Sequence, residues 1–171
     1  MTRRDELLDA TVEYILEHGV GHLSLRPLAR ATGTKARLLI YHFGSREKLI
    51  QAALTAALRR VQTRFLQSET SILGFWQWAT SPKNQSYLRL VFEVHGLAPR
   101  NPRLYGRYVR DAIATWKSII SSRISGRNRT ETATAIIAVF DGLLMDYLAT
   151  GERARTTRAL RLFLRKIGGR T

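Results

Sequence analysis

Cysteine is absent from the 171 residues of this sequence. Its absence excludes disulfide bonds and metal sites built on thiolates. Long apolar stretches are missing too: no run reaches the roughly eighteen residues that indicate a membrane-spanning helix, and the first residues lack the apolar segment of a secretory signal peptide. We therefore expect a cytoplasmic protein that makes no use of a membrane.

Residue groups that support catalysis are also missing. The sequence shows no serine, histidine and aspartate arrangement and no grouping of metal ligands. The acidic residues Glu93, Asp111, Asp141 and Asp146 are too scattered to indicate a carboxylate pair. We expect no enzyme activity, no metal and no cofactor.

Acidic residues are scarce. The chain has 13 aspartates and glutamates against 28 lysines and arginines, a formal net charge of +15. Such an excess favours a polyanionic partner, because lysine and arginine release counterions when they meet phosphates. However, residues 1–48 carry eight basic and six acidic side chains, whereas residues 49–171 carry twenty and seven. Charge alone therefore does not locate a nucleic-acid site.

Helical spacing of apolar residues runs through almost the whole chain, and no strand-like alternation of useful length occurs. Glycines, prolines and short polar residues mark the helix ends, and Ser24, Asn101 and Asn128 are placed to cap helix N-termini. The sequence predicts an all-α protein with about nine helices, over residues 4–17, 25–31, 35–41, 45–65, 71–79, 87–97, 102–122, 128–150 and 156–167.

Thr32-Gly33-Thr34 joins two of the short helices and has the composition of a tight turn. Three short helices with such a turn fit a helix-turn-helix, in which the second helix braces against the DNA backbone and the third enters the major groove. By spacing alone, an ordinary corner of a helical bundle fits equally well.

A more specific pattern covers residues 7–49. It consists of Leu7-Leu8-Asp9-Ala10, Gly19, Ser24-Leu25-Arg26-Pro27-Leu28-Ala29, Ala31-Thr32-Gly33 and Tyr41-His42-Phe43-Gly44-Ser45-Arg46-Glu47-Lys48-Leu49. This pattern resembles the N-terminal signature of the TetR family of transcriptional regulators. The resemblance implies an all-α homodimer that binds a pseudo-palindromic operator, with half-sites about 34–36 Å apart. It implies a three-helix head at residues 1–48, with its motif at about residues 24–43, and a helical-bundle body for ligand binding and dimerisation at residues 49–171.

The resemblance also implies roles for single residues of the head. Lys35, Ala36 and Arg37 would face base edges. The residues that would reach phosphates are Ser24, Thr34, Tyr41, His42 and Lys48. A simpler interpretation of His42 is that it completes the core of the head.

The third helix departs from the family's common pattern at three positions. Lys35 replaces a small N-capping residue, Arg37 stands where glycine is frequent, and Ile40 stands where a phosphate-contacting tyrosine is frequent. Ile40 has no hydrogen-bond donor to offer a phosphate. A guanidinium binds guanine O6 and N7 together, so we hypothesise that Arg37 reads a guanine in each half-site.

Aromatic residues concentrate between residues 75 and 116, where the resemblance places a small-molecule effector. Pockets for such ligands are mostly apolar with a few polar groups. The predicted pocket residues are Trp76, Trp78, Tyr87, Phe92, His95, Tyr108 and Trp116. Aromatic residues at helical spacing also form ordinary cores, and His95 is either a core histidine or a polar anchor in the pocket.

The last two predicted helices have the apolar faces of a dimer interface. Two such helices from each chain would form a four-helix bundle across a two-fold axis. The predicted interface residues are Ile136, Phe140, Leu143, Tyr147, Leu160, Phe163, Leu164 and Ile167, and Ala135, Ala138 and Gly142 form a small-residue face beside them. The alternative is that these helices pack only within their own chain.

These observations predict a sequence-specific, DNA-binding regulator, more specifically a repressor that a small apolar or aromatic effector releases. The alternative is a ligand-binding or interaction protein that keeps the head as a scaffold and no longer reads DNA sequence. A basic stripe, formed by Arg103, Arg107, Arg110 and Lys117, is either a solvated face or a site for an anionic partner.

Overall fold

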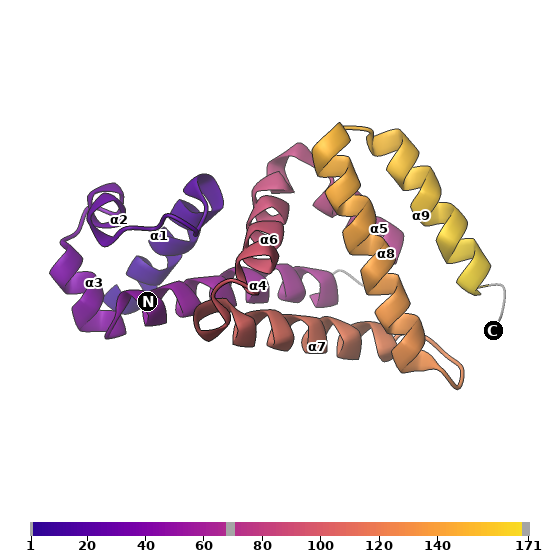
Figure 1. Cartoon of the computed structure of the whole chain (residues 1–171), viewed down its shortest axis with the longest axis horizontal. Helices are drawn as coiled ribbons and strands as arrows, with labels where there is room; N and C mark the ends of the chain where they lie inside the picture. Colours follow the sequence, from indigo (N-terminus) through magenta and orange to yellow (C-terminus); the bar gives the residue numbers. More distant parts are fainter. Residues whose placement is uncertain (1, 68–70, 169–171) are drawn as a thin grey trace. The chain divides into compact units, whose positions relative to one another are not determined.

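A computed structural model describes residues 2–67 and 71–168 of the chain. Within these ranges it contains nine α-helices and no strand, so the predicted all-α fold is confirmed (Figure 1). The α-helices are α1 (Arg3–His18), α2 (Leu25–Ala31), α3 (Ala36–Phe43), α4 (Arg46–Gln67), α5 (Ile72–Ala79), α6 (Gln85–Leu97), α7 (Arg107–Ser121), α8 (Arg129–Thr150) and α9 (Arg153–Gly168). A short 3₁₀ turn, Pro82–Asn84, precedes α6, and a π-helical turn, Pro102–Gly106, precedes α7.

Side-chain caps account for several helix starts. The Thr2 hydroxyl accepts a hydrogen bond from the Asp5 amide at 3.2 Å, and the Asp5 carboxylate accepts one from the Thr2 amide at 2.9 Å, which is a capping box. Asn101 Oδ1 accepts from the Leu104 amide at 3.2 Å, as the sequence predicts. The capping predicted for Ser24 and Asn128 is wrong, because neither side chain makes a capping hydrogen bond.

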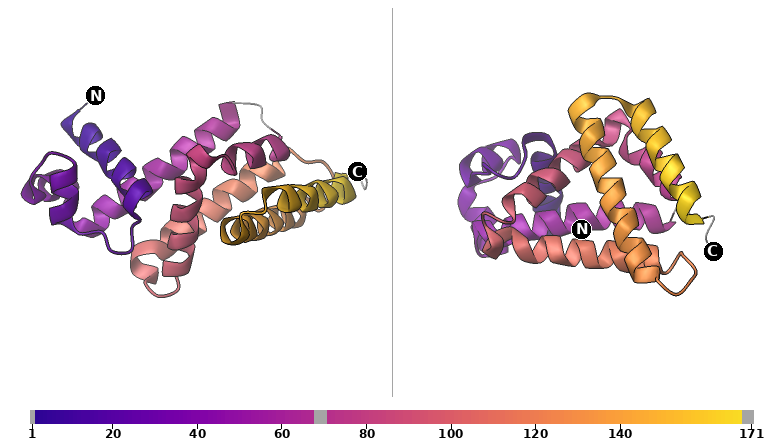
Figure 2. Two further views of the ribbon diagram at one scale, coloured as in Figure 1. Left: turned by 90° about the horizontal axis from the view of Figure 1, so that it is seen from above. Right: turned by 45° about the vertical axis from the view of Figure 1, so that its right-hand side comes forward.

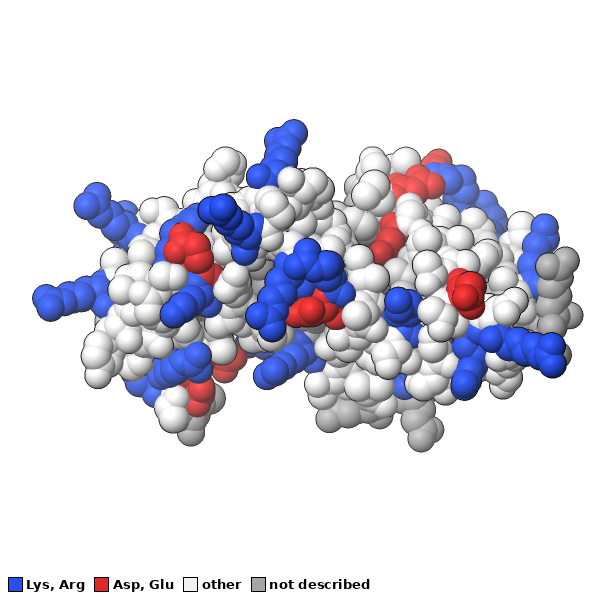
Figure 3. Space-filling view, turned by 60° about the horizontal axis from the view of Figure 1, so that its bottom comes forward, with Lys and Arg blue, Asp and Glu red and all other residues white. Residues whose placement is uncertain are grey.

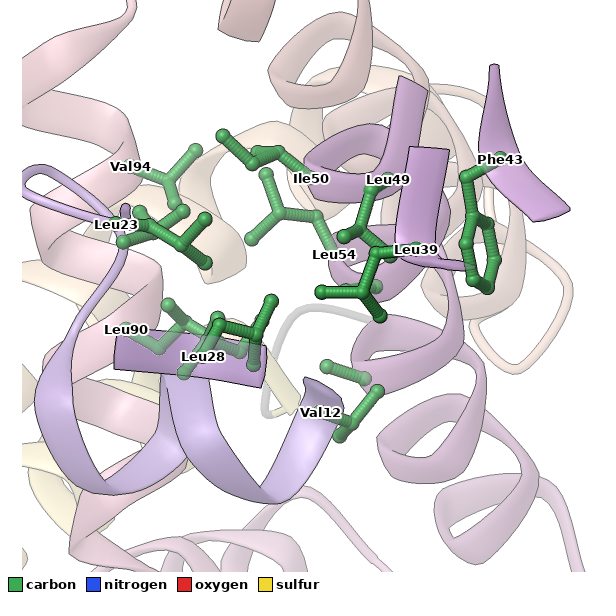
Figure 4. Packing of buried hydrophobic residues seen from close by; sticks show 14 of the residues in the cluster. Val12, Leu23, Leu28, Leu39, Phe43, Leu49, Ile50, Leu54, Leu90 and Val94 are labelled. Carbon is green, nitrogen blue, oxygen red and sulfur yellow. The ribbon is translucent and has the colours of Figure 1, made fainter. Parts of the chain in front are cut away.

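The chain divides into two compact units, which we describe separately. Unit 1 is Met1–Glu69 with Ser86–Val109, and unit 2 is Thr70–Gln85 with Arg110–Thr171. The core of unit 1 joins the short N-terminal helices to α4 and α6: Leu28 and Leu39 lie in one cluster with Leu90 and Val94 (Figure 4). Helix α6 therefore takes part in the same hydrophobic core as the helix-turn-helix.

Unit 2 is built on the contact between α8 and α9, which lie side by side and are joined at Gly151 in the left-handed conformation (Figures 1 and 2). Trp76 of α5 is fully buried, and its indole nitrogen donates to Thr157 Oγ1 at 2.8 Å. The Tyr147 hydroxyl donates to the Thr80 carbonyl at 3.1 Å. These two bonds attach α5 and the residue after it to both long helices.

Candidate nucleic-acid interface

The connection between α2 and α3 is a tight turn centred on Gly33. Gly33 has φ = +62°, a conformation that favours glycine. The Thr34 amide donates to the Ala29 carbonyl at 2.8 Å, and the Thr32 hydroxyl donates to the Leu28 carbonyl at 2.8 Å. The Thr34 bond folds the turn back onto the end of α2, and the Thr32 bond closes the last turn of α2 itself, so residues 25–43 form a helix-turn-helix.

Helix α3 has one face in the core and another in solvent. Leu39 is fully buried and Phe43 nearly so. Arg37 and Tyr41 are exposed, and their spacing of four residues places them on the same face of the helix. The Tyr41 side chain is 81% exposed, although it is large and aromatic. The core therefore gives Tyr41 no packing role, and the exposed face of α3 is the surface available to a partner.

The predicted base-contacting residues lie at the start of α3. Lys35 is the N-cap residue with an extended backbone, and its side chain makes no capping hydrogen bond. Lys35 and Arg37 are exposed, whereas Ala36 is half-buried against the core. The unshielded first turn of a helix carries partial positive charge, so this end of α3 suits contact with an electronegative surface.

The predicted phosphate-contacting residues lie at the start of α2, in the turn before α3, within α3 and in the first turn of α4. Ser24 is exposed at the start of α2, and because its hydroxyl does not cap that helix it is available to a ligand. Lys48 is exposed in the first turn of α4. Thr34 is half-buried, and the half-buried His42 ring meets the Tyr41 ring edge-on at 5.2 Å. Both proposed roles of His42, phosphate contact and core packing, are compatible with this position.

Two arginines that the sequence did not single out hold this region in place. Arg46 Nε donates to the Leu23 carbonyl at 2.8 Å, which ties the start of α4 to the residue before Ser24. The guanidinium of Arg4 lies 5.0 Å from the centre of the Phe43 ring, within cation–π distance. No sequence pattern indicated the Arg46 contact, because its acceptor is a backbone carbonyl far along the chain.

The aromatic residues predicted to form one ligand pocket lie in two different units. Tyr87, Phe92, His95 and Tyr108 belong to unit 1, and Trp76, Trp78 and Trp116 belong to unit 2. Among them, burial lowers the pKa of His95 and raises that of Tyr108 to about 12, so both side chains are uncharged at neutral pH.

Within unit 2 the rings of Trp78 and Trp116 lie 5.3 and 5.2 Å from that of Phe75, which also stacks on Phe140 at 5.6 Å. Trp76 meets Phe140 edge-on and is fully buried. Trp76 is therefore a core residue of unit 2, whereas Trp78 and Trp116 keep part of their surface exposed.

Burial raises the pKa of Asp141 on α8 from 3.8 to about 6. Because the folded protein holds this proton more tightly than the unfolded chain does, we expect the free energy of unfolding to fall as the pH rises from about 4 to about 6. The shift corresponds to roughly 3 kcal/mol. Asp141→Asn should remove this dependence and raise the melting temperature at pH 7.5. Urea titrations at a series of pH values measure it, and Glu131→Gln, an exposed site on the same helix, should leave the slope unchanged.

The large residues predicted at a dimer interface are mostly covered by their own chain. Ile136, Phe140, Tyr147 and Leu160 are buried within unit 2. Leu143, Phe163, Leu164 and Ile167 are half-buried. What α8 exposes is the small-residue face, Ala135, Ala138 and Gly142, together with Met145, which is 56% exposed.

Helix α8 is unusually apolar for a helix with so little burial. Among the described residues it is the one helix long and apolar enough to cross a membrane by length and composition, and 28% of its apolar window is buried. Its apolar character therefore exceeds what the packing of its own chain uses.

Basic side chains are not confined to the helix-turn-helix. Figure 3 shows lysine and arginine side chains dispersed over one whole face of the molecule, with few acidic ones among them. In the basic stripe, Arg103, Arg107 and Arg110 are exposed and Lys117 is half-buried. Exposed positive charge alone therefore does not mark α3 as the nucleic-acid site.

Comparisons with known proteins agree with this geometry. The family model described as "Bacterial regulatory proteins, tetR family" matches residues 7–53, which cover most of α1, all of α2 and α3 and the start of α4. Over 166 residues the chain is 26% identical to the HTH-type nicotine-responsive transcriptional repressor HdnoR of Paenarthrobacter nicotinovorans, with 86% of this chain and 84% of that protein covered.

Solved structures show the same fold. A transcriptional regulator from Rhodococcus sp. Rha1 is similar with a TM-score of 0.78 at 18% identity, over 94% of this chain and 93% of that one. The multidrug binding protein EbrR, complexed with proflavin, is similar with a TM-score of 0.65 at 24% identity, over 94% and 98%. The fold, with an N-terminal helix-turn-helix head and a helical body, is thus confirmed.

Proposed function

We propose that the chain is a homodimeric repressor of the TetR family of DNA-binding transcriptional regulators, which a small molecule releases from its operator. The observation that carries the proposal is helix α3, which buries Leu39 and leaves Arg37 and Tyr41 exposed on one face. A helix of this kind fits the major groove of DNA. The proposed division of labour is a DNA-reading head at residues 1–48 and an effector-binding and dimerisation body at residues 49–171.

Selection of bound duplexes from a random pool at physiological salt tests the DNA-binding part of this proposal. We expect a palindromic consensus, because two heads related by a two-fold axis read two equivalent half-sites. Recovery of sequence-blind binding alone would instead favour an interaction protein that retains the head as a scaffold, since phosphate contacts carry no sequence information.

Arg37 is expected to set the base preference. Arg37→Ala should relax the selected consensus at one position of each half-site, with a loss of about 1–3 kcal/mol for the preferred duplex. Affinity for duplexes altered at that position should change little. Fluorescence anisotropy on a series of point-substituted duplexes measures the pattern, with Lys48→Ala as the comparison. If Arg37→Ala weakened every duplex equally, as expected of a phosphate contact, the base-reading role would be wrong.

We infer that the effector is small and largely apolar or aromatic. Within unit 2, the partly exposed Trp78 and Trp116 rings offer apolar aromatic surface. Within unit 1, the half-buried His95 and Tyr108 are uncharged at neutral pH. The nicotine-responsive relative and the proflavin-bound neighbour support an aromatic nitrogen compound as the first class to test. Thermal shift with nicotine and with proflavin provides that test, since a ligand that binds the folded state raises its melting temperature.

We propose that the homodimer forms through the small-residue face of α8, Ala135, Ala138 and Gly142, together with the exposed Met145 beside it. Small residues let two helix backbones approach closely, and pairing would cover the apolar surface that α8 leaves exposed. Helix α9 packs against α8, and its half-buried residues Phe163 and Leu164 extend the proposed contact. We further propose that the protein acts in the cytoplasm, where bacterial operator DNA lies. We propose no catalytic activity for it.

A further inference from the structure

The carboxylate of Glu93, on α6, binds the backbone of the turn between α1 and α2. The Val20 amide donates to both carboxylate oxygens at 3.0 Å, and the Gly21 amide donates to Oε1 at 2.7 Å. Hydrogen bonds to a charged acceptor are stronger than those between neutral groups. More than seventy residues separate the partners along the chain, and all of them lie in unit 1.

The turn is shaped to receive this carboxylate. Gly19 has φ = +79°, and a Cβ atom at Gly19 would lie 2.9 Å from Glu93 Oε2. A Cβ atom at Gly21 would lie 3.1 Å from Oε1. Side chains at these two positions would therefore crowd the carboxylate, so both glycines permit the close approach of the turn to Glu93.

The turn leads directly into the residues that face DNA. The Leu23 amide donates to the Val20 carbonyl at 3.2 Å, and the Leu23 carbonyl accepts the bond from Arg46. Ser24, the next residue, is the N-cap residue of α2. On the other side, Leu90 and Val94 of α6 are buried in the core that contains Leu23, as Figure 4 shows, so Glu93 projects from a fixed helix.

We propose that Glu93 is a positioning residue for DNA binding: it fixes the turn at Val20 and Gly21 and thereby holds Ser24 where its hydroxyl reaches a phosphate. The proposal rests on the DNA-binding function proposed above. The expected effect of removing Glu93 on DNA affinity is opposite to the effect of its charge alone. Removal of a negative charge would by itself strengthen binding to a polyanion, whereas loss of a positioning contact weakens it.

The test measures binding to a random-sequence duplex of roughly 30 base pairs, about three helical turns, which senses phosphate contacts without requiring a known operator. We expect Glu93→Leu to weaken binding by about tenfold, because the apparent affinity falls with the fraction of molecules whose turn is in place. Glu93→Gln keeps one carbonyl acceptor and should lose less. Glu17→Gln, which removes an exposed charge from α1, is the matched control and should bind equally or more tightly.

Two further readouts separate positioning from loss of folding. Circular dichroism at the binding temperature must show a fully folded variant, and the Val20 and Gly21 amides should exchange faster with solvent in Glu93→Leu than in the unmodified protein. Should Glu93→Leu itself fail to fold, Gly21→Ala, which crowds the carboxylate from the other side, should weaken binding in the same direction.

The positioning role would be overturned if folded Glu93→Leu bound the duplex as tightly as the unmodified protein or more tightly. It would also be overturned if the Val20 and Gly21 amides exchanged at the same rate in Glu93→Leu and in the unmodified protein. A failed selection of a consensus would instead count against the repressor function and leave the amide-exchange result intact, so the two failures are distinguishable.

Discussion

Gly142→Arg is expected to yield a folded monomer that no longer binds operator DNA tightly. Gly142 is exposed on α8, and apart from its chain neighbours and the adjacent helix backbone no atom of the described residues lies within 4 Å of the position that a Cβ would occupy, so a single chain accommodates the new side chain. In the proposed dimer the same side chain would separate two closely packed helices and bury an unpaired charge. Loss of the second head removes the avidity of a two-site contact, about 10²–10⁴-fold in affinity.

Light scattering after gel filtration measures the mass of the Gly142→Arg protein in solution, which is compared with the 19.5 kDa of one chain. Gly96→Arg is the matched control, since Gly96 is an exposed helical glycine on α6 with equally open space around it. It adds the same charge and should remain dimeric. A dimeric Gly142→Arg protein would show that the chains pair through another surface.

Leu39→Ala is expected to be the most damaging single truncation in the head. The Leu39 side chain is fully buried between α2 and α4, in the core shown in Figure 4. Truncation of such a leucine leaves a cavity and lowers the free energy of unfolding by about 2–5 kcal/mol. Because Leu39 also anchors the buried face of α3, duplex binding should fall with stability.

Urea unfolding followed by circular dichroism gives the change in stability. Leu66→Ala, at a half-exposed site on α4, makes the same chemical change and should alter stability by only about 0.5 kcal/mol. Equal losses in the two variants would mean that the core of unit 1 is not organised around Leu39.

Local patterns predicted the helices well, because their signals lie within a few residues of each end. Gly151 ends α8 in the left-handed conformation, and Ser71 caps α5 by accepting from the Gly74 amide at 3.1 Å. Asn128, at φ = −104° and ψ = 45°, lies outside the extended conformation that a capping residue usually adopts, which explains why it does not cap α8. Ser24 has the extended backbone, at φ = −119° and ψ = 140°, and still makes no capping hydrogen bond.

Long-range packing could not be predicted in the same way. Periodicity showed that α8 has a face of large residues and a face of small ones, but not which of them its own chain covers. In the structure Phe140 meets the rings of Phe75 and Trp76, and the small face remains exposed. The contacts of Glu93 and Arg46 with backbone groups likewise leave no trace in sequence spacing.

Helix α3 is proposed to read DNA sequence with its exposed face. The most direct test is the ratio of the affinity for the selected duplex to the affinity for a scrambled duplex, measured across a range of salt concentrations. We predict a ratio of at least about 10³ that persists as salt rises, because base contacts add to a phosphate term common to both duplexes. A ratio near one at every salt concentration, with both affinities falling steeply together, would contradict it.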